Sequence, residues 1–107
     1  MPKCRRGKVV ENKVGRRYRR AGYNVKLRRK TSAGEIDVFA TRRSERIAVE
    51  VKHGNKKRLI SSGDVKKVAK KAKVAKAKPV LILSGKAEAT LPAIKTARDL
   101  GVRIKRL

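Results

Sequence analysis

Apolar residues recur at near-helical spacing in three segments of the chain, residues 7–21, 64–78 and 91–100. The residues expected to face inward are Val10, Val14, Tyr18 and Ala21; Val65, Val68, Ala69, Ala72 and Ala75; and Leu91, Ile94, Ala97 and Leu100. Gly22 and Gly101 follow the first and third segments, in the position that glycine favours just past a helix. Pro79 should end the second segment. The pattern predicts three amphipathic helices.

Between these segments the apolar positions alternate or form short runs, as is typical of strands. Five strands are expected, at residues 23–27, 35–41, 46–52, 80–84 and 102–107. Short connections should pair the first three strands antiparallel, and each later strand–helix–strand unit should be parallel and right-handed. The uniformly apolar run "VLILS" is typical of a buried central strand. The fold class is therefore α/β, a mixed central sheet flanked by helices in the order α-β-β-β-α-β-α-β.

The charge balance of the chain indicates an anionic binding partner. The 107 residues carry 33 Lys and Arg against 8 Asp and Glu, a formal net charge of +25. Such a charge opposes compaction unless a polyanion neutralises it, and nucleic acid is the obvious one. An anionic membrane surface is a weaker alternative, because no helix has a large aromatic and leucine face. The expected DNA-binding residues are Arg5, Arg6, Lys8, Arg29, Lys30, Lys66, Lys67, Lys70, Lys71 and Lys73.

Residues 1–6 should form a basic N-terminal arm, followed by one domain over residues 7–107. No apolar run is long enough to cross a bilayer, and there is no signal-peptide core. We expect a soluble, cytoplasmic protein associated with the nucleoid.

Two of the scarce acids lie inside apolar strands. If residues 42–45 form a hairpin loop, Asp37 falls opposite Glu50, and Lys52 shares the face of Glu50. Ile36 and Val38 should face the other side. Two carboxylates this close repel each other unless a cation lies between them, either Lys52 or a divalent metal ion.

Glu11, the only acid in the first 34 residues, lies at the inward edge of the first helix. Mg²⁺ prefers carboxylate oxygens and water, so Asp37 and Glu50 could hold it, with the Val51 carbonyl as a further ligand. Lys52 could position or deprotonate an attacking water, and Glu11 could orient water or a second ion. Each acid could instead serve only in a structural ion pair.

The spacing of Asp37 from Glu50-Val51-Lys52 resembles the PD-(D/E)XK nucleases, which have the restriction-endonuclease-like fold. "GKVVE" at 7–11 is similar to the opening of archaeal Holliday junction resolvases, and "AGYNV", "GEIDVFA" and "IAVEVK" are similar to small RecB-like nuclease domains. The resemblance implies catalysis by Glu11, Asp37, Glu50 and Lys52. It also aligns Ser32 with a serine of the resolvase site. Ile36 stands where many members have proline.

These observations together predict a Mg²⁺-dependent DNA endonuclease, with Mn²⁺ as a substitute ion. The resemblance implies branched DNA as substrate, in repair or recombination. Four-way junctions are cut at two symmetric positions, so we expect a homodimer that packs through residues 79–107. The alternative is a basic nucleic-acid-binding protein without catalysis, of ribosomal or chromatin type.

Overall fold

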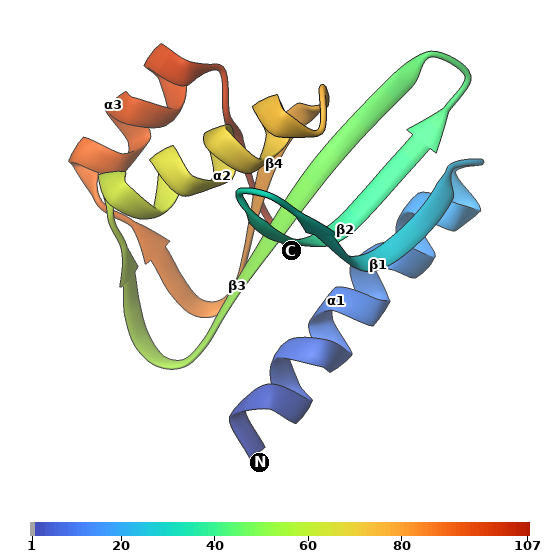
Figure 1. Ribbon diagram of the computed structural model, residues 1–107. Coiled ribbons are helices and arrows are strands. Elements are labelled where there is room, and N and C mark those ends of the chain that lie inside the picture. The colour runs from blue at the N-terminus through green and yellow to red at the C-terminus, as the bar shows by residue number, and fades with distance from the viewer. Residues whose placement is uncertain (1) are drawn as a thin grey trace.

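The computed structural model describes residues 2–107, with side chains from Gly7 onward. Its elements are α1 Pro2–Arg20, β1 Asn24–Thr31, β2 Gly34–Arg42, β3 Glu45–Ile60, α2 Ser62–Val74, β4 Lys78–Ala89, α3 Leu91–Leu100 and β5 Arg103–Arg106 (Figure 1). This is the predicted order of helices and strands. Within residues 2–107, no helix is both long and apolar enough to span a membrane.

The five strands form one sheet in the order β1-β2-β3-β4-β5. β1 and β3 pair antiparallel with β2, whereas β4 pairs parallel with β3 and β5. Helix α1 covers one face of the sheet, and α2 and α3 cover the other (Figure 1). Val14 of α1 packs with Val38 and Val49, whereas Val65 of α2 packs with Leu81 of β4. The mixed sheet between two layers of helices is confirmed.

The hairpin between β2 and β3 has the predicted register. Val38 pairs with Val49, and pairing continues to Arg42 and Glu45, so only residues 43–44 form the turn. Arg43 takes a left-handed backbone conformation with φ of 55°. A two-residue turn with positive φ suits the twist of a hairpin, which explains why the loop is shorter than the predicted four residues.

The expected alternation fails at Asp37. The β2–β3 ladder stops at Val38 and Val49, and Ile36 packs with Phe39 on the α2 side of the sheet. The prediction that Ile36 and Val38 share a face is therefore wrong. The irregularity extends into β1, where Arg28 has a positive φ of 53°. β2 thus leaves regular pairing at the residue that carries the candidate carboxylate.

Two helix boundaries also differ from the sequence prediction. α1 begins at Pro2 rather than Gly7, so the helix includes most of the proposed basic arm. α2 ends at Val74 rather than at residue 78, because Lys76 turns into the left-handed region with φ of 54°. Pro79 then lies inside β4, and it does not end the helix.

Helix α3 faces the core with only one of the residues expected, Ala97. Ala93 and Ala97 are buried, whereas Leu91, Ile94 and Leu100 are exposed, Leu91 by 81%. Alanines allow α3 to pack closely against α2 and the sheet, so the small residues take the inner face. The predicted leucine stripe is wrong, and it forms an apolar strip on the surface.

Candidate active site

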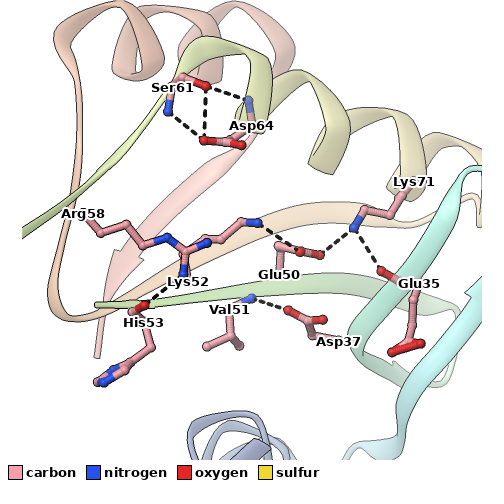
Figure 2. A network of polar contacts seen from close by, with 10 residues as sticks. All are labelled: Glu35, Asp37, Glu50, Val51, Lys52, His53, Arg58, Ser61, Asp64 and Lys71. Carbon is pink, nitrogen blue, oxygen red and sulfur yellow. Dashed lines mark hydrogen bonds and ion pairs between the residues drawn. The ribbon is translucent and has the colours of Figure 1, made fainter. Parts of the chain in front are cut away.

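Asp37 lies where β2 separates from β3. Its carboxylate Oδ2 accepts a hydrogen bond from the Val51 backbone N–H at 2.8 Å (Figure 2). In a continued ladder a backbone carbonyl of β2 would accept from β3 instead. The carboxylate therefore extends the strand pairing by one bond, and this fixes its position relative to the backbone of β3.

Glu50 points toward α2. Its Oε1 lies 2.9 Å from Nζ of Lys71, and its Oε2 lies 3.6 Å from Nζ of Lys52 (Figure 2). Sequence reasoning offered Lys52 as the cation for Glu50, yet Lys71 is the closer of the two. The signal for Lys71 was its place on the helix, three residues after buried Val68 and four before Ala75.

The electrostatics of this region concentrate on Asp37. Burial raises the pKa of its carboxyl to about 7, and the nearby negative charges of Glu50 and Glu11 add to the rise. The Val51 N–H and the Lys71 ammonium lower that pKa in part. Burial and the two neighbouring acids disfavour the charged form of Asp37, and a bound cation would relieve this effect.

Glu11 approaches the same region from α1. Its Oε1 lies 2.8 Å from Nη1 of Arg28, the β1 residue with the left-handed backbone. The left-handed conformation costs about 1–2 kcal/mol in a residue that is not glycine. Sequence reasoning missed this pairing, because no local pattern joins residues 17 positions apart.

The three acids Glu11, Asp37 and Glu50 line one pocket together with Lys52. It is lined by Gly7, Glu11, Asp37, Glu50, Val51, Lys52, His53, Gly54, Asn55, Lys56, Lys57 and Arg58. The last four residues, 55–58, belong to a mostly basic stretch of β3. Sequence reasoning omitted them, although the run "NKKR" lies shortly after the predicted strand. Lys56, Lys57 and Arg58 are exposed, and Arg58 donates to the His53 carbonyl at 2.9 Å.

The acids suit a metal ion that keeps much of its water. Among the described residues, no group of three or more Asp, Glu, His or Cys side chains could hold a metal by itself. Mg²⁺ commonly uses one or two carboxylates, with water and substrate phosphate completing its octahedron. Asp37 and Glu50 fit that requirement, because both carboxylates line the same pocket.

Of the predicted DNA-binding residues, most lie on the surface. The exposed ones are Lys8, Lys30, Lys66, Lys67, Lys70 and Lys73. Arg29 stacks over the Phe39 ring at 4.3 Å, and Lys71 is bonded to Glu50. The side chains of Arg5 and Arg6 lie outside the described part of the structure. Ser32 is exposed in the turn between β1 and β2.

Several solved structures share this architecture. A protein of unknown function, AF1548, superposes with a TM-score of 0.80 at 20% identity, over 94% of this chain and 58% of that one. EndoMS in complex with double-stranded DNA has a TM-score of 0.61 at 15% identity, over 79% of this chain and 36% of that one. SfsA from Pyrococcus furiosus, in complex with Ca²⁺, has a TM-score of 0.56 at 17% identity, over 80% and 48%. These likenesses support the restriction-endonuclease-like fold. The chain spans only part of the length of these proteins: 58% of AF1548, 36% of EndoMS and 48% of SfsA.

Among curated proteins, no sequence matches this one. The sequence profile described as archaeal Holliday junction resolvase (Hjc), a family of endonucleases of DNA recombination, matches residues 2–106. The match covers nearly the whole chain, including both candidate carboxylate strands. The chain therefore belongs to the archaeal Holliday junction resolvase family.

Proposed function

We propose that this protein is a divalent-metal-dependent endonuclease that cuts four-way DNA junctions during recombination and repair. The observation that carries the proposal is the position of Asp37, fixed on the Val51 N–H beside Glu50 and Lys52 in a chain of the resolvase family. A nuclease of this kind would act beside the DNA in the cytoplasm.

In this proposal Asp37 and Glu50 hold one Mg²⁺, with the Val51 carbonyl as a further ligand and Mn²⁺ as a substitute. When bound, the ion would polarise the scissile phosphate and lower the pKa of water. The hydrogen bond from Val51 fixes the Asp37 carboxylate in advance, so that little reorganisation is needed.

The chain's other groups position the reactants. Lys52, whose side chain is 22% exposed, reaches the pocket and can orient the attacking water or stabilise charge on the phosphate. Glu11 lines the same pocket and can orient a water once Arg28 turns to a phosphate. This division of roles is the one that the sequence resemblance implies.

The DNA-binding surface follows the pocket and the helices. The exposed lysines of α2 and the stretch Lys56–Arg58 of β3 carry positive charge on both sides of the acids. Lys8 adds charge from α1. Few aromatic residues are present and Phe39 is buried, which favours contact with phosphates over base stacking.

A second copy of the chain is the proposed partner. The apolar strip of α3, Leu91, Ile94 and Leu100, lies in a region with only six basic and two acidic residues between positions 79 and 107. Two chains of charge +25 repel each other least where each is least basic. An isologous contact there would give a homodimer with two equivalent sites.

Cleavage assays test the proposal directly. The purified protein is incubated with Mg²⁺, Mn²⁺ or EDTA on linear, nicked, flapped and four-way substrates, beside Asp37→Asn as a matched control. We expect cleavage of four-way junctions that needs the metal and is lost in the variant. Wild-type protein that binds all four substrates and cuts none would instead favour the non-catalytic DNA-binding alternative.

A further inference from the structure

Lys71 differs from the other lysines of α2. Lys66, Lys67, Lys70 and Lys73 are exposed, whereas the Lys71 side chain is only 14% exposed. Its Nζ donates to Glu50 Oε1 at 2.9 Å and to the Glu35 carbonyl at 2.9 Å (Figure 2). A lysine that gives up most of its hydration for two hydrogen bonds is held in a specific place.

The stem of Lys71 is fixed as well as its ammonium. A Cβ at Gly34, the first residue of β2 after its tight connection to β1, would lie 3.3 Å from Cδ of Lys71. The lysine stem therefore lies against the backbone of that connection. Lys71 thus joins three elements that meet at the site: α2, the start of β2 and the Glu50 position of β3.

The Lys71 ammonium also occupies Oε1, one of the two Glu50 oxygens that a metal ion could use. Glu50 is one of two proposed ligands, and its nearest cation is Lys71 at 2.9 Å, with Lys52 farther away at 3.6 Å. A carboxylate oxygen that accepts from an ammonium has less electron density and less open space for a divalent cation. The positive charges of the ammonium and of a divalent ion at the same carboxylate would also repel each other.

We infer that Lys71 is a positioning residue that stands in for the divalent ion at Glu50. This inference rests on the proposed function. In the metal-free protein the ammonium holds Glu50 and the start of β2 in place. When the metal binds, Glu50 is shared or released, so Lys71 weakens metal binding and raises the metal concentration that the protein needs.

Mn²⁺ binding without DNA tests this inference, measured by the loss of the free-ion electron paramagnetic resonance signal. Lys71→Met removes the ammonium and keeps most of the stem. Lys71→Arg keeps the charge, and Lys70→Met removes an equal charge from an exposed position on the same helix. We expect the Mn²⁺ dissociation constant of Lys71→Met to fall on the order of tenfold. Lys71→Arg and Lys70→Met should stay near the wild-type value.

Thermal unfolding in EDTA gives the second readout. Lys71→Met should lower the melting temperature, because it leaves Glu50 with the weaker Lys52 contact, and Mn²⁺ should restore more of it than in Lys70→Met. Where Lys71→Met does not fold, Lys71→Gln keeps a hydrogen bond to the Glu35 carbonyl, and the same tightening of Mn²⁺ binding is expected.

The inference is overturned if Lys71→Met binds Mn²⁺ with the same affinity as Lys70→Met, or more weakly. That result, together with metal-dependent cleavage by the wild type, would leave the proposed function standing. If no protein of the set binds Mn²⁺ and the wild type cuts no junction, both the inference and the proposed function fail.

Discussion

The Val51 N–H donates to Oδ2 of Asp37 at 2.8 Å, just beyond Val38 and Val49, the last β2–β3 backbone pair. Where the two strands separate, a side-chain carboxylate thus accepts the hydrogen bond that a strand carbonyl would otherwise accept. The Asp37 side chain therefore has a structural role in addition to its proposed role as a metal ligand, and suitable substitutions separate the two.

Asp37→Asn should keep the fold, because the amide oxygen still accepts from Val51. Asp37→Ala should be less stable than Asp37→Asn by about 1–3 kcal/mol, since it leaves that N–H without a partner. Urea unfolding of both variants at pH 8 checks the difference. Equal stability of the two would mean that the hydrogen bond contributes nothing.

The raised pKa of Asp37 predicts how stability changes with pH. Its folded pKa of about 7 lies above the unfolded value of 3.8, so the folded protein binds more protons between these values. The contribution of Asp37 is fully present below about pH 4 and is lost as pH rises through 7. The free energy of unfolding of Asp37→Asn, relative to wild type, should therefore rise over this window, by at most about 4 kcal/mol.

Urea unfolding from pH 4 to pH 8.5 in EDTA checks this slope. Above pH 7, saturating Mn²⁺ in place of EDTA should stabilise the wild type but not Asp37→Asn, because the ion neutralises the carboxylate. The difference between the free energies of unfolding of the two proteins should then disappear. A difference that does not change with pH would contradict the buried, repelled state of Asp37.

Lys52→Ala should reduce junction cleavage by about 10²–10⁴-fold, the usual range for loss of a positioned proton-transfer group. Arg20→Ala, at an exposed position at the end of α1, is the control and should cut nearly as fast as the wild type. Single-turnover cleavage with saturating protein separates the chemical step from binding. A loss explained entirely by weaker DNA binding would remove Lys52 from the catalytic group.

The basic stretch beside the pocket should contribute to DNA affinity. Replacing Lys56 and Lys57 by Ala should make the slope of log K against log salt less steep by about 2, since each contact contributes about 0.9. Lys95→Ala with Arg98→Ala, both exposed on α3, removes the same charge from another surface and should change the slope little. Fluorescence anisotropy with a four-way junction at several salt concentrations gives both slopes.

The apolar strip of α3 should control assembly. Ile94→Glu should convert a dimer into a monomer at micromolar concentration without loss of folding, because Ile94 is 40% exposed in the single chain. Val74→Glu, at an exposed apolar position of α2, is the matched control. Sedimentation equilibrium with and without DNA measures the mass, and a wild-type mass of one chain under both conditions would contradict the homodimer.

The sequence by itself determined the order of elements and the register of the central hairpin. Apolar periods of about 3.6 and 2 distinguish helices from strands wherever one face is buried. The register from Val38–Val49 to Arg42–Glu45 was expected from a hairpin loop at residues 42–45, and it keeps the core residues of both strands buried. The candidate acids could be named because they interrupt apolar runs in a chain with few acids.

Only the tertiary structure decided which groups neutralise those acids. Lys71 and Arg28 reach Glu50 and Glu11 from elements distant in sequence, and no local period encodes such pairs. The inner face of α3 was only partly predicted, since Ala97 was expected there but close packing selected Ala93 over larger apolar residues. The break at Asp37 arises from the competition of a side-chain carboxylate with the strand backbone for one N–H, which is settled only when the two strands are in place.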